Sequence, residues 1–238
     1  MQDEPIDPER LARRVAELHN KGVAADGLYG ADEVIAGGVL PVRPARSNSW
    51  VDDFFRYMRV LIRLEQIAQG PPPAELARLL DAMFNRIIPR LLRPLETGGR
   101  EIMPRLTHTD LWHGNMATGS DGNPVIFDPA CIYGHNEMEI GVWANPRMVA
   151  GMPLINSYHE FFAKSAPAED FTGRNTLYAL AFETRVSATV LGNGFFRQEL
   201  IRYLTDLDNN LPESYEEWAQ ARGEEICPPK ADSGMHWP

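Results

Sequence analysis

Residues 108–130 read HTDLWHGNMATGSDGNPVIFDPA and combine three polar side chains with a turn. Asp110 and Asn115 are separated by four residues, and Asp128 follows after two short apolar runs joined by SDGN. Asp121 and Gly122 in this connection indicate a β-hairpin, because Asp-Gly suits the tight turns that match the twist of paired strands. The stretch therefore predicts a loop that carries Asp110 and Asn115, then a hairpin, then Asp128.

Phosphoryl transfer is the chemistry that uses these three side chains. It needs a carboxylate beside the attacking hydroxyl and oxygen ligands that hold Mg²⁺ against the phosphates of ATP. The kinase catalytic loop has the pattern H-R-D-x-x-x-x-N, and His108, Asp110 and Asn115 keep its spacing. Asp128 opens D-P-A where protein kinases have the metal-binding D-F-G. The alternative is that each residue caps a turn, but the three together with the hairpin favour catalysis.

Helical patterns dominate the rest of the chain. The segment 8–21 follows an Asp-Pro capping signal, carries apolar residues at helical spacing and stops at Gly22. Residues 22–49 lack such periodicity and predict a long loop with one short strand at 33–35. The other helices predicted from apolar spacing cover residues 54–64, 76–91, 154–162, 177–191 and 195–207.

The composition argues against several classes of partner. The chain of 238 residues has 33 acidic and 23 basic side chains, and its net charge of -10 repels phosphate backbones and anionic lipids. The N-terminus lacks an apolar signal segment, and no window holds the ~18 apolar residues that span a bilayer. Cys131 and Cys227 have no metal-ligand spacing. We therefore expect a soluble, cytoplasmic protein that binds neither nucleic acid nor membranes.

Two segments, HTDLWHGN and PVIFDPACIYGHNEMEIG, resemble the fructosamine kinases, also called ketosamine-3-kinases or protein-ribulosamine 3-kinases. The pattern of that family is roughly HGDLWxGN, then a hairpin, then DPAxxYGHxExE. Trp112 and the YGH at 133–135 distinguish it from the aminoglycoside and choline kinases, which share only the Asp, Asn and Asp framework. The likeness extends more weakly through LPVRPARSNSW upstream and EDFTGRNTLYAL downstream, and the chain looks most like the fungal members.

This resemblance implies a protein-kinase-like fold and a deglycation reaction. Members of the family phosphorylate the 3-hydroxyl of ribulosamine or fructosamine adducts with Mg-ATP, after which the adduct decomposes and frees the amine. The substrates implied are glycated proteins or small ketosamines, and we expect a monomer. Carried onto matching positions, Asp110 would be the base for the sugar hydroxyl, and Asn115 and Asp128 would bind the metal and the nucleotide.

Six further residues near the motif have candidate roles. Trp112 could stack on the sugar or anchor the loop. His113 could face the substrate or only solvent, and His135 could contact the substrate or anchor the structure around it. The candidate substrate contacts are Trp112, His113 and His135, and the expected structural supports are His108, Glu137 and Glu139.

The sequence departs from the family in two places. Thr109 stands where the family usually has Gly, and a β-branched residue fits poorly if that position needs a positive φ. The larger departure is the N-terminal lobe, whose glycine-rich loop and strand lysine grip the phosphates. The chain has no G-x-G-x-x-G spacing, and its three lysines, Lys21, Lys164 and Lys230, lie outside strand patterns.

We therefore expect a kinase-like C-terminal lobe of the aminoglycoside phosphotransferase type, mainly α with a small β-hairpin and an absent or vestigial N-lobe sheet. Its expected parts are the lobe at 1–222, the catalytic and metal-binding loops at 105–130, a helical subdomain at 150–210 and a disordered tail at 223–238. Residue 1 would then lie near the linker between lobes, and activity by this chain alone is doubtful. The alternatives are another small-molecule kinase and a non-catalytic remnant that binds glycated protein.

Overall fold

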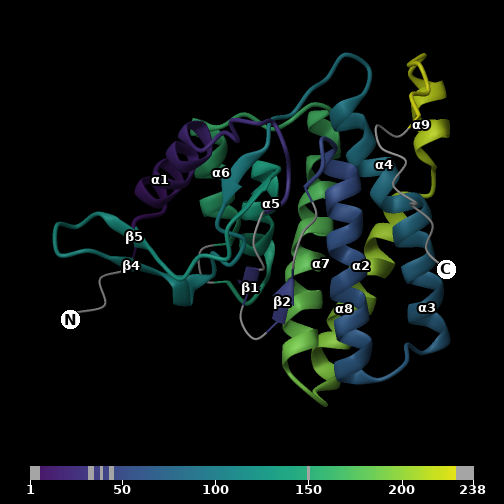
Figure 1. Ribbon diagram of the computed structural model, residues 1–238, viewed down its shortest axis with the longest axis horizontal. Helices are drawn as coiled ribbons and strands as arrows, with labels where there is room; N and C mark the ends of the chain where they lie inside the picture. Colours follow the sequence, from purple (N-terminus) through teal and green to yellow (C-terminus); the bar gives the residue numbers. More distant parts are fainter. Residues whose placement is uncertain (1–5, 32–34, 38–39, 43–45, 149–150, 229–238) are drawn as a thin grey trace.

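The computed structural model describes residues 6–31, 35–37, 40–42, 46–148 and 151–228, and it is mainly helical, as the sequence predicts. Figure 1 shows a bundle of long helices beside a smaller part in which short strands and loops lie among helices. The smaller part contains α1 (Pro8–Lys21), α5 (Asn136–Gly141) and α6 (Gly151–Phe161). The bundle contains α2 (Trp50–Gln69), α3 (Ala74–Ala82), α4 (Ile88–Leu92), α7 (Phe171–Thr189), α8 (Gly194–Asn210) and α9 (Tyr215–Ala221).

The first helix, α1, begins and ends where its capping residues predict. The Asp7 side chain accepts hydrogen bonds from the backbone N–H groups of Glu9 (2.9 Å) and Arg10 (3.3 Å), so the N-cap is confirmed. The helix ends at Lys21, and Gly22 is its C-cap. One face of α1 packs against α6, and its buried apolar residues are Leu11, Ala12, Val15 and Ala16.

The centre of the bundle is the contact between α2 and α7. Trp50, the first residue of α2, donates from Nε1 to the Tyr178 hydroxyl of α7 at 2.8 Å, and the Phe54 ring lies 5.4 Å from the Tyr178 ring. Phe54, Met58 and Leu61 follow the predicted helical spacing and are fully buried. Each such side chain contributes about 1.5 to 3 kcal/mol through burial, so this face holds α2 in place.

The helix predicted over residues 76–91 is continuous but irregular. After α3, residues Met83–Ile87 form a π-helical turn, α4 follows, and Arg93–Glu96 form a 3-10 turn. Pro89 has no N–H to continue the α-helical ladder, and the hydrogen-bond pattern changes in the turn just before it.

The strands form three two-stranded antiparallel sheets rather than one. The predicted hairpin is present: β4 (Met116–Thr118) pairs with β5 (Pro124–Ile126), and Gly122 in its turn has a φ of 75°. Apart from the strand expected at 33–35, the sequence does not predict the other strands, because strands of three residues are too short to show an alternating pattern. They are β1 (Ile35–Gly37) with β2 (Leu40–Val42), and β3 (Arg105–Thr107) with β6 (Ile132–Gly134).

The segment 22–49 is more structured than the long loop that its composition predicts. It contains β1 and β2, and the bridge Tyr29↔Ser47 joins two of its own residues. The bridges Val23↔Arg105 and Gly30↔Tyr133 attach it to β3 and β6, the strands that flank the motif at 108–130. The strand predicted at 33–35 lies mostly outside the described residues, and Ile35 begins β1.

The C-terminal segment packs against the bundle beyond the predicted end of the lobe. Ser214 and Glu217 form a capping box at the start of α9. Arg100 forms an ion pair with Glu224, whose backbone N–H donates to the Ala219 carbonyl at 2.9 Å. Of the tail expected to be disordered, residues 223–228 are described and Glu224 contacts the bundle, whereas residues 229–238 lie outside the described part.

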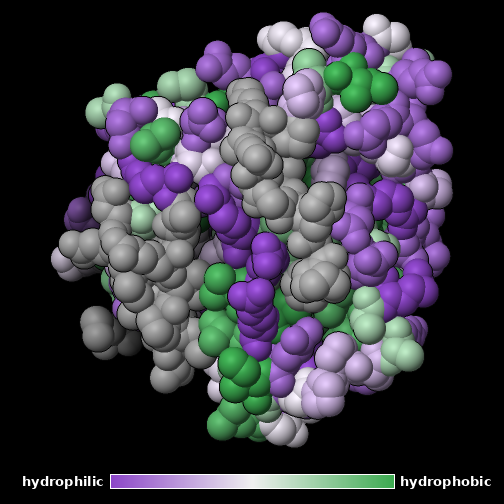
Figure 2. Space-filling model, turned by 45° about the vertical axis from the view of Figure 1, so that its right-hand side comes forward, coloured by the Kyte–Doolittle hydropathy of each residue, from purple (hydrophilic) through white to green (hydrophobic). Residues whose placement is uncertain are grey.

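Figure 2 shows hydrophobic side chains gathered at the lower end of the molecule, where α2 ends and α7 is followed by α8. Hydrogen bonds from the Gln69 side chain to the carbonyls of Ser187 and Val190 join the two helices there. The large exposed hydrophobic residues at this end are Ile67, Val190, Leu191 and Phe195.

Within the described ranges, no helix is long and apolar enough to cross a membrane.

Candidate active site

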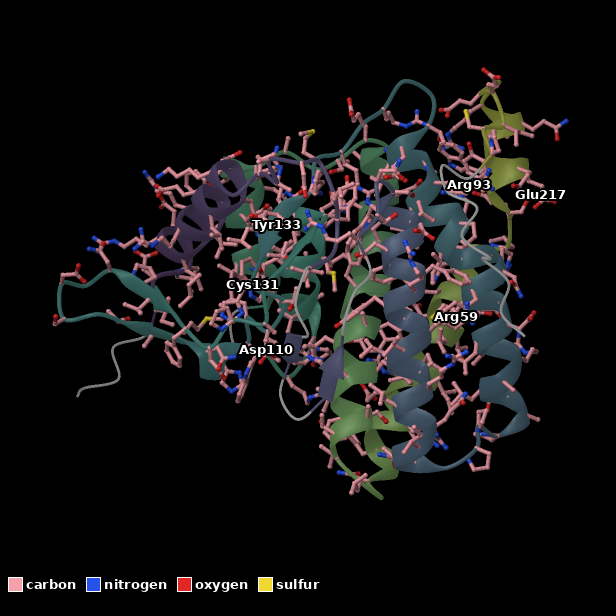
Figure 3. All side chains as sticks on the ribbon, viewed as in Figure 1. Arg59, Arg93, Asp110, Cys131, Tyr133 and Glu217 are labelled. Carbon is pink, nitrogen blue, oxygen red and sulfur yellow. The ribbon has the colours of Figure 1, made fainter. Side chains whose placement is uncertain are left out.

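The loop between β3 and the 3-10 turn His113–Asn115 carries Asp110, at the place where the smaller part meets the bundle (Figure 3). Thr109 in this loop has a φ of 58°, so the position does need the conformation that favours Gly. The resulting backbone strain is about 1 to 2 kcal/mol. The Thr109 hydroxyl offsets part of this cost because it donates to the Ala130 carbonyl at 2.5 Å.

Both carboxylate oxygens of Asp110 have partners. Oδ2 accepts a hydrogen bond of 3.1 Å from Asn115 Nδ2, which also donates to the Asp110 backbone carbonyl at 2.9 Å. Oδ1 forms an ion pair with the Arg185 guanidinium, which extends from α7. Burial raises the pKa of Asp110, whereas the charge of Arg185 opposes this rise. Asn115 and Arg185 thus hold the carboxylate in one orientation from two sides.

Glu139 of α5 supports the backbone of the loop that carries Asp110. Its carboxylate accepts the backbone N–H of His108 and, at 3.1 Å, that of Thr109. The side chain is fully buried, and His19 of α1 lies with Nε2 3.8 Å from Glu139 Oε2. A buried carboxylate that takes two backbone N–H groups gives the loop little freedom. The structure places Glu139 in the supporting position expected from the sequence.

His108 connects the Asp110 loop to the segment that carries Asp128. Its Nδ1 lies 3.3 Å from the Asp110 backbone N–H, and its Nε2 lies 2.8 Å from the Phe127 carbonyl. The neutral tautomer with hydrogen on Nε2 satisfies both contacts. The Ala130 N–H also donates to the His108 carbonyl at 3.0 Å. These bonds match the structural role predicted for His108.

Asp128 follows β5 with a φ of 56° and its side chain is exposed. Its charge contributes to raising the pKa of Asp110, so the two carboxylates influence each other. Within the described residues no cluster of three or more His, Cys, Asp or Glu could hold a metal. Mg²⁺ needs fewer protein ligands, because it keeps several waters and takes phosphate oxygens. Since Asn115 Nδ2 is committed to Asp110, the amide oxygen Oδ1 and the Asp128 carboxylate are the donors that fit such an ion.

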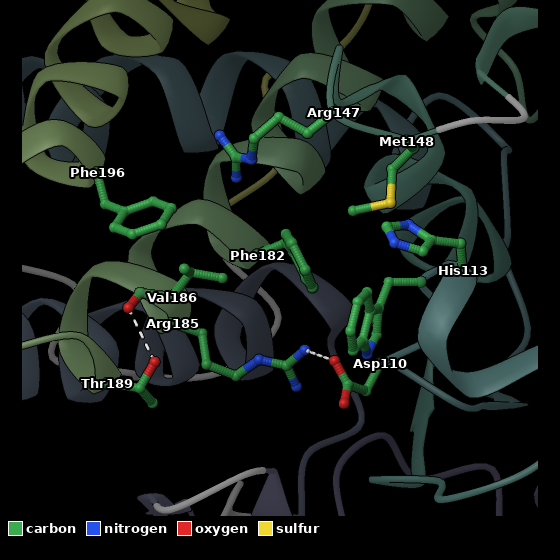
Figure 4. A pocket seen from close by; sticks show the side chains of 10 residues that line it. Asp110, His113, Arg147, Met148, Phe182, Arg185, Val186, Thr189 and Phe196 are labelled. Carbon is green, nitrogen blue, oxygen red and sulfur yellow. Dashed lines mark hydrogen bonds and ion pairs between the residues drawn. The ribbon is translucent and has the colours of Figure 1, made fainter.

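A cavity of about 410 Å³ opens beside Asp110 (Figure 4). A cavity of this size suits a small-molecule ligand. Its walls come from the catalytic loop, the segment before α6, and helices α7 and α8. The lining residues are Asp110, Trp112, His113, Arg147, Met148, Phe182, Arg185, Val186, Thr189 and Phe196.

Trp112 and His113, two candidate substrate contacts, both line this cavity. The Trp112 side chain remains exposed, with its ring 4.8 Å from the His113 ring. A Cβ at position 114 would lie 2.4 Å from the Trp112 ring, so only Gly114 leaves the ring in this place. The Gly of the HGN motif therefore positions an aromatic wall beside Asp110.

His135, the third candidate, does not reach the cavity, so a direct substrate contact is wrong for this conformation. It is fully buried, with Nδ1 2.9 Å from the Tyr178 hydroxyl and Nε2 2.8 Å from the Ser165 hydroxyl. Burial lowers the pKa of His135 to about 4, so the ring is neutral at pH 7. Glu137 beside it is also buried and pairs with Arg174 at 2.7 Å. Both residues are in the anchoring position that was the alternative for His135.

Several cavity residues have no signal in the local sequence. Arg185 is 75 residues from Asp110 along the chain, and Phe182 lies one helical turn before it on α7. Arg147 and Met148 follow the short helix α5 and belong to no motif that the sequence displays. Their polar or apolar character could be read from the sequence, but their approach to Asp110 depends on how α7 packs.

The two described lysines, Lys21 and Lys164, contact groups other than Asp110. Lys21, at the end of α1, is 3.6 Å from Glu17, and Lys164 lies 4.6 Å above the Phe171 ring. Lys230 is outside the described residues. The cation that contacts Asp110 is therefore Arg185, not a lysine.

Comparison with known proteins agrees with the family likeness of the motif. The sequence profile of the fructosamine kinase family matches residues 2–204. A chloroplastic protein-ribulosamine 3-kinase of Oryza sativa subsp. indica is 34% identical over 179 residues, which are 73% of this chain and 47% of the relative. A ketosamine-3-kinase of Mus musculus is 32% identical over 176 residues, which are 72% of this chain and 53% of the relative.

A solved structure of a proposed fructosamine-3-kinase from Thermobifida fusca has a similar fold, with a TM-score of 0.61 and 23% identity. The similarity covers 88% of this chain and 68% of that one. The chain spans about half the length of the curated relatives it matches. Because the family profile covers most of the sequence, the chain belongs to the fructosamine kinase family.

Proposed function

We propose that this chain carries the phosphoryl-transfer site of a ketosamine 3-kinase and forms a kinase-like C-terminal lobe. The substrates would be ribulosamine or fructosamine adducts on lysines of glycated proteins, or small ketosamines. The observation that carries the proposal is that the Asp110 carboxylate, oriented by Asn115 and Arg185, lines a ligand-sized cavity. Asp128 is near enough for its charge to raise the pKa of Asp110.

In the proposed reaction Asp110 accepts the proton of the sugar 3-hydroxyl. The O–H bond breaks while the hydroxyl oxygen bonds to the γ-phosphorus of ATP, and the bond from that phosphorus to the β-phosphate oxygen breaks. Asn115 and Asp128 would hold Mg²⁺, which offsets the phosphate charge when bound. Trp112 would form the wall against which the sugar lies.

The charge of the cavity lining does not separate a ketosamine from the substrates of the related small-molecule kinases. Aminoglycosides and choline are cations, and a ketosamine also carries a protonated secondary amine. The match to the fructosamine kinase family over residues 2–204 is what favours a ketosamine kinase over an aminoglycoside or choline kinase.

A lobe that binds glycated protein without catalysis is the second candidate. It is favoured by the positions of Lys21 and Lys164, which leave Asp110 without a nearby lysine in the described chain. Calorimetry separates the two candidates. Heat from a ribulosyl-lysine peptide but none from Mg-ATP would favour binding alone.

The direct test is ADP release from Mg-ATP and a ribulosyl-lysine peptide. We expect Asp110→Asn to lower the rate by about 10² to 10⁴ fold, because it removes the general base but keeps the shape of the side chain. The matched control is Asp121→Asn, since Asp121 is an exposed carboxylate in the hairpin turn. Equal rates for the wild type and Asp110→Asn would contradict the proposed function.

A further inference from the structure

The cavity beside Asp110 contains a cation that the proposed reaction does not use. Arg185 pairs with Asp110 and is nearly buried, with 8% of its side chain exposed. Arg147 lies elsewhere in the lining and is 35% exposed. In Figure 4, Phe182 lies between Arg147 and Asp110. Arg147 is thus available to a ligand that already contacts Asp110.

The position of Arg147 is held by its neighbours. Nη2 pairs with Glu183, and its backbone N–H donates to Asn145 Oδ1 at 2.9 Å. Its guanidinium lies 5.3 Å from the centre of the Phe196 ring and 5.8 Å from that of Phe195, both on α8. A guanidinium fixed in this way loses little side-chain entropy when it binds a ligand.

Arg147 also has hydrogen-bond donors to spare. Nε and Nη1 make no hydrogen bond to the described residues, whereas Nη2 is the atom that contacts Glu183. Glu183 is fully buried and also accepts from Asn145 Nδ2. Burial raises the pKa of Glu183, and the charge of Arg147 opposes this rise. The carboxylate of Glu183 is therefore ionised less readily than that of an exposed glutamate. Nη2 makes one bond to Glu183, so its second N–H together with Nε or Nη1 can still bind an acceptor with two oxygens.

We propose that Arg147 binds a carboxylate on the substrate, so that the preferred ketosamine carries an acidic group, as a glycated free amino acid does through its α-carboxylate. This inference rests on the proposed function, because it places the sugar at Asp110 and the amine-bearing part of the substrate along the apolar wall. Planar carboxylates match the fork of an arginine in two parallel hydrogen bonds. The aliphatic chain of a lysine adduct suits the intervening apolar residues, which are Met148, Phe182, Val186 and Phe196.

The test compares two ligands that differ only in this group. Nα-acetyl-Nε-ribulosyl-lysine has a free α-carboxylate, and its α-amide does not. We expect calorimetry on the full chain to give a dissociation constant about 10- to 100-fold lower for the acid than for the amide. A third ligand is a ribulosyl-lysine peptide amide with a neighbouring Glu. If it binds with an affinity near that of the acid, a carboxylate elsewhere in a protein substrate can replace the α-carboxylate.

The variants remove the cation without leaving its buried partner unpaired. Arg147→Gln combined with Glu183→Gln should bring the acid to the affinity of the amide and leave the amide unchanged, whereas Arg147→Lys should keep part of the preference. The matched control is Arg56→Gln with Asp52→Asn. Arg56 is likewise 35% exposed and pairs with a buried acid, but it lies outside the cavity lining.

The outcomes separate this inference from the proposed function. Equal affinity for acid and amide in the wild type overturns the inference, while ADP release that depends on Asp110 would still support the kinase. Failure of both ligands to bind also overturns it. A preference for the acid that survives in the double variant shows that another residue binds the carboxylate and likewise overturns the assignment to Arg147.

Discussion

Asp110 has no free carboxylate oxygen in this structure, because Arg185 occupies Oδ1 and Asn115 occupies Oδ2. A substrate hydroxyl must therefore share one of these oxygens with its present partner. Arg185, the partner of Oδ1, lines the cavity, whereas Asn115, the partner of Oδ2, does not. Oδ1 is therefore the oxygen that we assign to the cavity side. In the proposed reaction Arg185 would thus position the base and also lie where the substrate hydroxyl arrives.

Replacing Arg185 by Gln should lower kcat about 10- to 100-fold with a smaller change in KM, because a misplaced base affects the chemical step more than substrate binding. Arg185→Lys should recover part of kcat because it restores the charge but not the planar fork. The measurement is steady-state ADP release. An unchanged kcat in Arg185→Gln would show that Asn115 alone orients Asp110.

Thr109 has an unfavourable φ but makes a hydrogen bond through its hydroxyl, which offsets part of the strain. Thr109→Val keeps the strain and loses the hydrogen bond, so we expect it to lower the free energy of unfolding by about 1 to 2 kcal/mol. Thr109→Gly loses the same bond but relieves the strain, so its stability should stay within about 0.5 kcal/mol of the wild type. Urea denaturation measures both. Equal losses for Val and Gly would mean that the strain is negligible.

At the scale of elements, the helices that build the site are the ones with buried charges. All six residues of α5 are buried, including Glu137 and Glu139. Helix α7 buries Arg174, Glu183 and Arg185 as well as its apolar residues. Buried charges persist only when they are paired, and here each has a partner within the described residues. Apolar spacing therefore predicts α7 in outline but misses α5.

The first turn of α2 contains a buried carboxylate without such a partner. Both oxygens of Asp53 are buried and make no hydrogen bond to the part of the chain that the structure describes, and burial raises the pKa of Asp53 from 3.8 to about 7. A pKa above the unfolded value favours folding of the protonated form. Its contribution is fully present below pH 3.8 and is lost as the pH rises through 7. Raising the pH across this range should therefore destabilise the fold.

Asp53→Asn should remove this loss because the amide does not ionise. We expect the variant to be about 1 to 3 kcal/mol more stable than the wild type at pH 8 and close to it at pH 4. The measurement is urea denaturation at both pH values. Asp121→Asn is the control, since an exposed carboxylate should give the same small difference at both. A pH-independent effect of Asp53→Asn would mean that Asp53 is ionised in the folded protein throughout.

At the scale of the whole molecule, α7 joins two hydrophobic cores. It packs against α2 and α8 in the bundle and against α5 in the smaller part. The Tyr178 hydroxyl of α7 contacts both Trp50 and His135, which come from opposite sides of this junction. The cavity lies along the same helix, so the packing that joins the two parts also completes the site.

The net charge describes the surface of the whole protein and not the site. The chain carries -10 overall, but two guanidinium groups and one carboxylate line the cavity. An acidic protein can therefore offer a local site for an acidic ligand. Composition excludes broad classes of partner, whereas the charge of a site depends on which few side chains the fold brings together.

The sequence alone determined the hairpin that follows Asn115 and most of the long helices, and it singled out Asp110, Asn115 and Asp128 as candidates for phosphoryl transfer. These features depend on residues close together in the chain, or on periodic apolar spacing, and both can be read without coordinates. Only the tertiary structure decided that Arg185 pairs with Asp110, that Glu139 holds the loop and that Arg147 shares the cavity. Those contacts join residues about 30 to 75 positions apart, and no local propensity encodes how separate elements pack against each other.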